Sequence, residues 1–316
     1  MPSLLSIEKL SRNYGNLCAV DSITFELAKG DILGFLGPNG AGKTTTMDML
    51  TGNLAPSAGR VTVNGIDLLD EPRDAKRHIG YLPEQPPVYR DLTVDEYLAF
   101  CAHLNGIIKQ GRTKAINTVK ERTGLTKVGH RLIGNLSKGF QQRAGIAQAI
   151  IHMPDIVIMD EPTIGLDPLQ IREIRLLIRE LGQTHGVILS THILPEVQAT
   201  CSRVQIIHQG RLVFADTIAG LEQRLCADSL ILGLKKPPPK AFISNIQGVQ
   251  TVEALPDSRF RLHFAVGHNP AEQVLNHACE HGWGPYECRL EQHTLEQIFI
   301  DLTCRDQASQ ATEETD

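Results

Sequence analysis

The sequence predicts an α/β protein built on a mostly parallel sheet, followed by a small α+β domain. The first observation is a continuous apolar run at Ile32–Leu36, which has the length of a strand buried on both faces. The second is the glycine-rich stretch that follows it directly. The third is the alternation of strand-like and helix-like segments up to about residue 224, which is typical of a parallel sheet covered by helices.

Length and composition fit a large domain and a smaller one. The chain has 316 residues, with 31 Lys and Arg, 36 Asp and Glu, and a formal net charge of −5. This mild negative charge gives no reason to expect a nucleic-acid partner. The apolar runs are far shorter than the roughly 20 residues of a membrane-spanning helix, and we expect neither such a helix nor a signal peptide. The seven scattered cysteines fit reduced thiols in a cytosolic compartment.

The first part of the chain is predicted to form strands. Ser22–Leu27 alternates polar and apolar residues, and Lys29-Gly30 closes this strand with a turn. Val61-Thr-Val63 is followed by Asn64-Gly65, which is a strong hairpin signal. We therefore expect an antiparallel β subdomain beside the buried strand.

Helix signals dominate the middle of the chain. Residues 91–134 are predicted to be helical, and Thr93-Val-Asp-Glu96 is a capping box that opens this region. Ser137 is placed to cap a further helix. A buried strand then ends at Met159, and Asp167-Pro168 starts another helix with an N-cap and a proline at the first helical position.

Strand signals return after this helix. Val187–Ser190 is predicted to be a strand, and Val204–Ile207 with Arg211–Phe214 to form a hairpin. Beyond about residue 224 the pattern resembles a small βαββαβ domain of ferredoxin-like class, which we place at 228–304. Its first predicted elements are a strand at Ser229–Leu234, a stiff break at Lys235–Pro239 and two further strand-like runs. A helix from Pro270, a short strand near Tyr286–Leu290 and a last helix from Thr294 are predicted to follow. The polar, acidic residues 305–316 are predicted to be disordered.

The glycine-rich stretch fits the phosphate-binding pattern G-x-x-x-x-G-K-[ST] and lies between a strand and a helix. Its glycines let backbone N–H groups surround phosphate oxygens, and the helix N-terminus adds the positive end of its dipole. We expect Lys43 to reach the β- and γ-phosphates of ATP and Thr44 to hold Mg²⁺. The residues of this stretch, including the first helical turn, are Gly37, Pro38, Asn39, Gly40, Ala41, Gly42, Lys43, Thr44 and Thr45.

Two carboxylates follow the buried run Ile156-Val-Ile-Met159. Asp160 lies at the C-terminal end of this strand, and we expect its carboxylate to act on Mg²⁺ through bound water. Glu161 comes one residue later and is predicted to orient or deprotonate the water that attacks ATP. The chain is therefore predicted to bind and hydrolyse ATP.

A further segment narrows the class of ATPase. Leu136-Ser-Lys-Gly139-Phe-Gln141 resembles the L-S-G-G-Q signature motif of ABC ATPases, and it lies just before the acidic strand, as in that family. Three more positions resemble family landmarks. These are the aromatic that stacks on adenine, the loop aspartate that contacts the opposite subunit, and the switch histidine at the γ-phosphate (Tyr14, Asp167 and His192).

The resemblance covers about Leu4 to Gln223 and implies an ABC-type ATPase domain at 1–224, with a helical subdomain at about 86–136. It implies an ATPase subunit that drives a separate transmembrane permease from the cytoplasmic face of the membrane. Two copies, or this chain and a paralogue, would close head to tail around ATP. Ser137 and Gly139 of one subunit would then face the γ-phosphate held by the other.

The direction of transport is also predicted from resemblance. Three segments are similar to export-type ABC ATPases of the multidrug and gliding-motility groups: Pro83–Pro87, Leu92–Val94 and Leu295–Phe299.

Two other classes of ABC protein fit this sequence less well. Ribosome-acting relatives carry two cassettes, and SMC-type ATPases carry a long coiled coil. This sequence has one phosphate loop and no sustained heptads between that loop and the signature. Nothing in it identifies the transported substrate.

Some positions depart from the family pattern. Lys138 and Phe140 replace a glycine and a glutamine that are common in the signature motif. Where the family has a glutamine that couples Mg²⁺ and water to the permease, this chain has Glu84, followed by Gln85. We favour Glu84 for that role, with Gln85 as the alternative. The departures also leave open a non-catalytic or regulatory subunit with a degenerate site in a heterodimer.

Overall fold

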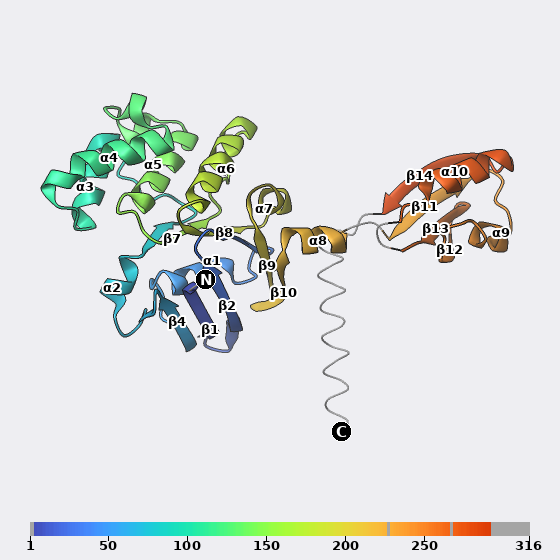
Figure 1. Cartoon of the computed structure of the whole chain (residues 1–316), viewed down its shortest axis with the longest axis horizontal. Helices are drawn as coiled ribbons and strands as arrows, with labels where there is room; N and C mark the ends of the chain where they lie inside the picture. Colours follow the sequence, from blue (N-terminus) through green and yellow to red (C-terminus); the bar gives the residue numbers. More distant parts are fainter. Residues whose placement is uncertain (1–2, 226–227, 266–267, 292–316) are drawn as a thin grey trace, which may run out of the picture. The chain divides into compact units, whose positions relative to one another are not determined.

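The structure is a computed structural model that describes residues 3–225, 228–265 and 268–291. The chain divides into two compact units, Met1–Ile218 and Ala219–Asp316 (Figure 1). None of the helices in the described ranges combines the length and the apolarity that crossing a lipid bilayer requires.

The first unit is built on a six-stranded sheet in the order β10-β9-β3-β8-β7-β6. Strands β9, β3, β8, β7 and β6 run parallel, and β10 pairs antiparallel with β9 at one edge. Leu36 pairs with Thr191 and Asp160 with Ser190, so β3, β7 and β8 end side by side. The strands are β3 Ile32–Leu36, β6 Ile79–Leu82, β7 Ile156–Asp160, β8 Gly186–Thr191, β9 Arg203–His208 and β10 Arg211–Thr217.

A second, antiparallel sheet packs against one face of the first. Its strand order is β2-β1-β4-β5 (β1 Ser3–Tyr14, β2 Leu17–Ala28, β4 Ala58–Val63, β5 Ile66–Asp67). Strand β7 shows how the layers meet, because alternate side chains of a strand point to opposite faces. Ile156 and Ile158 join the core shared with the antiparallel sheet, while Val157 and Met159 join the core shared with helices. Both faces are covered, which explains why the run is apolar throughout.

Helices fill the remaining layers of this unit. Met47 and Leu50 of α1 belong to the core between the two sheets. Figure 1 shows α3, α4 and α5 grouped together, and Leu98, Val119 and Ile146 join their core to the central sheet. The helices are α1 Lys43–Leu50, α2 Pro72–Lys76, α3 Val94–Leu104, α4 Lys109–Thr123, α5 Lys138–Ile150, α6 Pro168–Gly182 and α7 Leu194–Thr200, with 3₁₀ turns η1 Thr126–Val128 and η2 Ile133–Asn135. Helix α8 Ile218–Leu225 begins at the boundary, and all but its first residue belong to the second unit.

The predicted helix caps and hairpin turn are confirmed. Thr93 and Glu96 form a reciprocal capping box at the start of α3. Ser137 caps α5, and Asp167 caps α6 by accepting a hydrogen bond from the backbone N–H of Gln170 (2.9 Å). The Asn64-Gly65 turn joins the antiparallel strands β4 and β5, and both of its residues have positive φ, as a type I′ turn requires.

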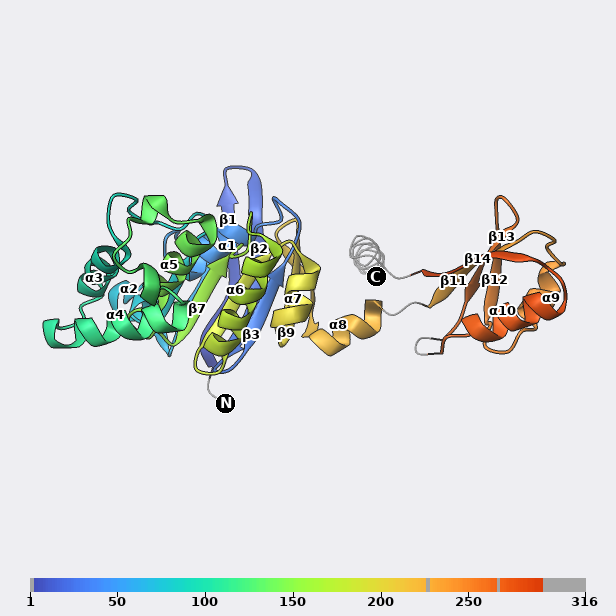
Figure 2. The ribbon, with the colours of Figure 1, turned by 90° about the horizontal axis from the view of Figure 1, so that it is seen from above.

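After α8, the described part of the second unit holds elements in the order β-α-β-β-α-β. Its four strands form an antiparallel sheet in the order β12-β13-β11-β14. Ile243 of one helix and Val274 of the other pack into one core with Leu230 and Leu232. Figure 2 shows both helices of this unit, α9 and α10, beside its strands. The elements are β11 Ser229–Leu234, α9 Lys240–Ser244, β12 Thr251–Leu255, β13 Arg259–His263, α10 Ala271–Glu280 and β14 Pro285–Glu291.

The sequence predictions for the end of the chain fall outside the described residues. These are the helix from Thr294, the export-like segment Leu295–Phe299 and the disordered tail at 305–316.

Candidate active site

The site lies where three neighbouring parallel strands end. Strand β3 leads into the phosphate loop, β7 into Glu161, and β8 into His192. Their ends meet at one edge of the sheet and surround a pocket of about 450 Å³. Its lining residues are Tyr14, Leu17, Ala19, Asn39, Gly40, Gly42, Lys43, Thr44, Thr45, Glu84, Glu161, Ile164 and His192. The predicted phosphate loop, catalytic glutamate, switch histidine, aromatic and Glu84 therefore share one cavity.

The phosphate loop is held in shape by backbone geometry and by its lysine. Gly42 has a φ of 104°, and a Cβ there would meet the carbonyl oxygen of Ala19 at 2.5 Å, so only glycine fits. The Nζ of Lys43 donates to the carbonyl oxygens of Gly37 (2.9 Å) and Pro38 (3.2 Å). Within the described chain no side chain caps α1, which leaves its first N–H groups available to an anion in the pocket.

Glu161 is buried in the wall of the pocket, with charged and polar partners on several sides. It is 6% exposed, and its Oε1 accepts a hydrogen bond from Nδ1 of His192 (2.9 Å) and lies 3.6 Å from Nζ of Lys43. The hydroxyl of Thr191 lies 3.3 Å from its other oxygen. Its φ of 48° is in the left-handed region, which is uncommon for a residue with a side chain and recurs at functional sites. The backbone thus turns this carboxylate toward the pocket.

Asp160 has the surroundings of a metal-binding carboxylate. It is 1% exposed, and neither of its oxygens accepts a hydrogen bond from any described residue. Burial raises its pKa, while the nearby hydroxyls of Ser190 and Thr44 oppose that rise. A buried carboxylate without partners costs free energy, and a cation compensates for that cost. Carboxylate and hydroxyl oxygens are ligands that Mg²⁺ accepts, so these residues fit the predicted ion.

Arg12 is a site residue that the sequence analysis missed. Tyr14 is 47% exposed, and the guanidinium of Arg12 lies 4.8 Å from the centre of its ring. Arg12 is itself held by a hydrogen bond from Nη1 to the carbonyl oxygen of Ala55 (2.8 Å). A cation over one face of the tyrosine orients the ring within the pocket wall. The signal was available, because residues two apart on a strand share a face.

Glu196 is a second residue that the sequence analysis missed. This carboxylate on α7 is 2% exposed and accepts hydrogen bonds from the hydroxyls of Thr163 and Thr191 (3.1 Å to the latter). Thr163 lies two residues after Glu161, and Thr191 directly precedes His192. Glu196 thus ties together the two loops that carry the predicted catalytic side chains. The available signal was an acidic residue in the first turn of the helix that follows the histidine.

Ser137, Gly139 and Asp167 do not line this pocket. Ser137 is exposed, and its hydroxyl accepts a hydrogen bond from the backbone N–H of Phe140 (3.4 Å). Gly139 is buried, and a Cβ there would meet the amide of Gln170 at 2.6–3.0 Å. Asp167 is exposed at the start of α6. Within one chain, the signature motif therefore contributes nothing to the cavity that holds the phosphate loop.

The positions at and beside the departures from the family pattern differ in their surroundings. The side-chain amide of Gln141 donates to the carbonyl oxygens of Ile133 (3.2 Å) and Leu136 (3.1 Å), which fixes the turn before α5. Lys138 is exposed. Glu84 lines the phosphate-loop pocket, whereas Gln85 lines only a neighbouring cavity of about 590 Å³ that Glu84 also borders.

Comparisons with known proteins agree with this geometry. A family model described as ABC transporter matches residues 20–164. The linearmycin resistance ATP-binding protein LnrL of Bacillus subtilis (strain 168) is 32% identical over 307 residues, covering 96% of this chain and 99% of that protein. The bacitracin transport ATP-binding protein BcrA of Bacillus licheniformis is 40% identical over 215 residues, covering 67% of this chain and 69% of that protein.

Solved structures show the same fold for the first unit. An ATP-binding subunit of an ABC transporter matches with a TM-score of 0.64 at 30% identity, covering 70% of this chain and 93% of that one. The protein cbiO1 from Clostridium perfringens, part of the ABC transporter complex cbiONQ, gives a TM-score of 0.65 at 26% identity, covering 70% and 91% of the two chains. Because the match to LnrL spans nearly both whole sequences, this chain belongs to the ABC transporter family as an ATP-binding protein.

Proposed function

We propose that this chain hydrolyses ATP as one half of a head-to-tail dimer and drives a separate membrane permease in export. The observation that carries the proposal is the pairing of a complete phosphate-loop pocket with a signature helix that lies outside it. A site divided in this way needs a second subunit to place Ser137 and Gly139 against the γ-phosphate.

The roles within one chain follow from the contacts in the pocket. Lys43 and the free N–H groups of α1 bind the β- and γ-phosphates. Thr44 and Asp160 hold Mg²⁺, which neutralises phosphate charge when it is bound. Glu161 accepts a proton from the attacking water, and His192 orients Glu161 through their 2.9 Å hydrogen bond. Tyr14 stacks on the adenine.

The helical subdomain is proposed as the contact with the permease. Tyr89, Phe100, Leu104 and Ile108 are exposed apolar side chains, and the rings of Tyr89 and Phe100 pack edge to face with their centres 5.5 Å apart. Exposed apolar clusters of this kind mark protein interfaces. Glu84 borders both the pocket and the adjacent cavity, and we propose that it couples the two. LnrL is a linearmycin resistance protein and BcrA a bacitracin transport protein, which supports export of an antibiotic-like compound.

The C-terminal unit is proposed to be an accessory domain of ferredoxin-like class. Its element order and its antiparallel strand order β12-β13-β11-β14 support this assignment. Its own core, formed by residues such as Leu232, Phe260 and Trp283, supports independent folding.

A mixing experiment tests the divided site. A Lys43→Ala chain lacks the phosphate cation, and a Ser137→Arg chain blocks the signature helix, so each homodimer has two defective sites. In a mixed dimer, the normal phosphate loop of the Ser137→Arg chain meets the normal signature of the Lys43→Ala chain. We expect ATP hydrolysis to reappear on mixing. Two inactive chains that stay inactive when mixed, under conditions where wild type hydrolyses ATP, would contradict a shared site.

A second measurement separates this proposal from a non-catalytic subunit. We expect the Glu161→Gln chain to form an ATP-dependent dimer in size-exclusion chromatography, and Ser137→Arg in the same background to prevent it. A wild-type chain that hydrolyses no ATP, alone or with its permease, would instead favour the regulatory role.

A further inference from the structure

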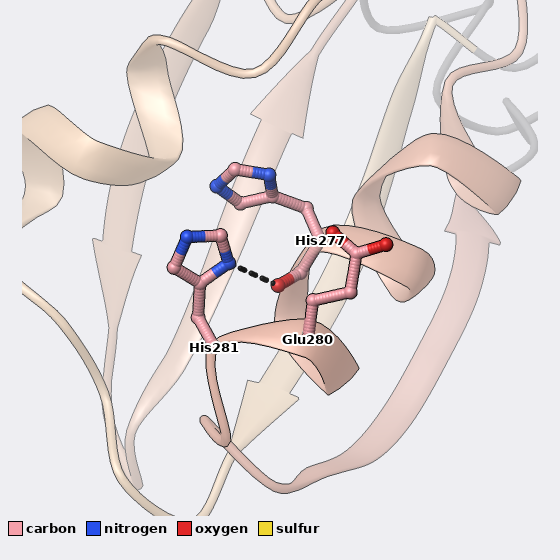
Figure 3. A group of neighbouring side chains, drawn as sticks. All are labelled: His277, Glu280 and His281. Atoms are coloured by element: carbon pink, nitrogen blue, oxygen red, sulfur yellow. Dashed lines mark hydrogen bonds between the residues drawn. The ribbon is translucent and has the colours of Figure 1, made fainter.

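The last turn of α10 places three metal-binding side chains together, far along the sequence from the ATP site. One ring nitrogen each of His277 and His281 and one carboxylate oxygen of Glu280 all lie within 4.8 Å of one another. The two histidines are four residues apart, which puts them on one face of a helix. Figure 3 shows their rings facing each other beside Glu280, and the ring centres are 4.1 Å apart.

A hydrogen bond sets the protonation of one ring. Nδ1 of His281 lies 2.9 Å from the carbonyl oxygen of His277, and because a carbonyl only accepts, Nδ1 carries the proton (Figure 3). The lone pair of His281 is then on Nε2, which Figure 3 shows on the side of the ring away from Glu280, so this exposed ring must turn to present Nε2 to a shared ion. A histidine that binds a metal through one nitrogen usually donates from the other to a carbonyl or carboxylate, as this ring does.

The position on the helix also favours a cation. Glu280 is the last residue of α10 and His281 is its C-cap. The final carbonyl groups of a helix carry the negative end of its dipole, which attracts positive charge. Glu280 adds a full negative charge, and both Glu280 and His281 are exposed, so their side chains are free to turn toward an ion.

We propose that His277, His281 and Glu280 form a binding site for a divalent late transition-metal ion, with Zn²⁺ as the first candidate. Two imidazoles and a carboxylate suit Zn²⁺, Ni²⁺ and Cu²⁺, whereas Mg²⁺ and Ca²⁺ prefer oxygen ligands. Zn²⁺ binds nitrogen at about 2.0–2.1 Å, so the three ligand atoms must move closer than their present spacing, with water completing the shell. The proposal does not depend on ATP hydrolysis.

The chain contains its own reporter for this site. Trp283 is its only tryptophan, with ring centres 5.3 Å from His277 and 5.6 Å from His281. It is buried in the core of the C-terminal unit. An ion that reorients the two imidazoles therefore changes the surroundings of Trp283, and bound Cu²⁺ or Ni²⁺ is expected to quench its fluorescence.

The test titrates the full chain, free of nucleotide, with ZnCl₂ by calorimetry and with NiCl₂ by tryptophan fluorescence. We expect one Zn²⁺ per chain, quenching that saturates at the same ratio, and a higher unfolding temperature with metal, because ligands that bind only the folded state stabilise it. His281→Asn and the His277→Asn, His281→Asn double variant should lose all three effects. Glu280→Gln should weaken binding by about tenfold or more.

Matched controls separate this site from general metal binding. His130 is an exposed histidine in the other unit, and His130→Asn should bind Zn²⁺ as wild type does. Cys279 is an exposed thiol next to Glu280, and Cys279→Ser should also leave binding unchanged. Because His281 is exposed, its substitution should leave the circular dichroism spectrum unchanged. The proposal is overturned if wild type binds no Zn²⁺, if the double variant keeps the wild-type stoichiometry, or if Cys279→Ser abolishes binding.

Discussion

Two helices of the ATPase unit begin with the residues that bind phosphate in this family, and their surroundings differ sharply. Helix α1 starts after Gly42, with a buried Lys43 whose Nζ lies 3.6 Å from Glu161. Helix α5 starts after Ser137, which is exposed and whose hydroxyl is occupied with capping its own helix. Both helix ends attract anions. Only the first lies in the pocket that Glu161 also lines. Under the proposed function, the first therefore takes part in hydrolysis within its own chain, and the second completes the site of another subunit.

The contrast is sharpest for Glu161, the buried carboxylate close to the start of α1. Glu161→Gln keeps the shape of the side chain but removes the base. We expect turnover to fall by about 10²–10⁴-fold, because that is the usual contribution of general-base catalysis. ATP affinity should stay within a fewfold of wild type. Steady-state phosphate release and equilibrium ATP binding measure the two quantities, and turnover near the wild-type rate would remove Glu161 from its role.

The lysines at the two helix starts offer a matched pair. Lys43→Ala removes a buried cation from the phosphate loop, and hydrogen bonds to charged groups contribute about 1.5–3 kcal/mol. We therefore expect ATP affinity of the isolated chain to fall by about 10–150-fold. Lys138→Ala changes an exposed side chain at α5 and should leave that affinity unchanged. Calorimetry measures the ATP affinity of both variants. Equal losses of affinity would contradict the proposal that only α1 binds ATP within one chain.

Glu196 tests whether the first site depends on its supporting network. Glu196→Gln retains an acceptor for one threonine hydroxyl but loses the charge that strengthens both hydrogen bonds. We expect kcat to fall by about tenfold, corresponding to roughly 1.4 kcal/mol, with the KM for ATP little changed. Glu196→Asp should recover part of the rate. A merely structural role would instead lower the unfolding temperature while leaving kcat per folded chain intact.

The smallest predicted effect concerns Arg12 behind Tyr14. An exposed cation–π contact contributes about 0.5–1 kcal/mol, so Arg12→Ala should weaken ATP binding by about two- to fivefold. Tyr14→Ala removes the stacking surface itself and should cost about 1–3 kcal/mol. Fluorescent-nucleotide binding to both variants ranks them. A larger loss for Arg12→Ala than for Tyr14→Ala would mean that Arg12 contacts the nucleotide directly.

The sequence predicted much of the fold and the centre of the site because the signals are local. Asp160 ends β7, Glu161 and His192 directly follow β7 and β8, and Lys43 follows β3 after the phosphate loop. These strands belong to one parallel sheet and end at the same edge. Capping residues such as Thr93 mark helix starts through contacts three residues away. The short helix α9 was missed, because five residues after a proline run carry too little periodicity to register.

Other features depend on contacts between distant segments, which a pattern does not reveal. Glu196 contacts Thr163 across 33 positions of sequence, and Arg12 contacts Ala55 across 43. The place of Ser137 in the site was predicted from family resemblance, and within one chain Ser137 does not line the pocket. The sequence did not predict the cluster at His277 and His281. Its geometry depends on α10 extending to Glu280, and the end of a helix is hard to predict from sequence.

The ion pair between Lys43 and Glu161 places one cation between the phosphate loop and the proposed base. The ammonium lies 3.6 Å from the carboxylate and donates to the carbonyl oxygens of Gly37 and Pro38. A phosphate that enters the pocket must share this cation with Glu161, because both are anions. Under the proposed function, the substrate and the base therefore depend on the same lysine, which links nucleotide binding to the surroundings of the base.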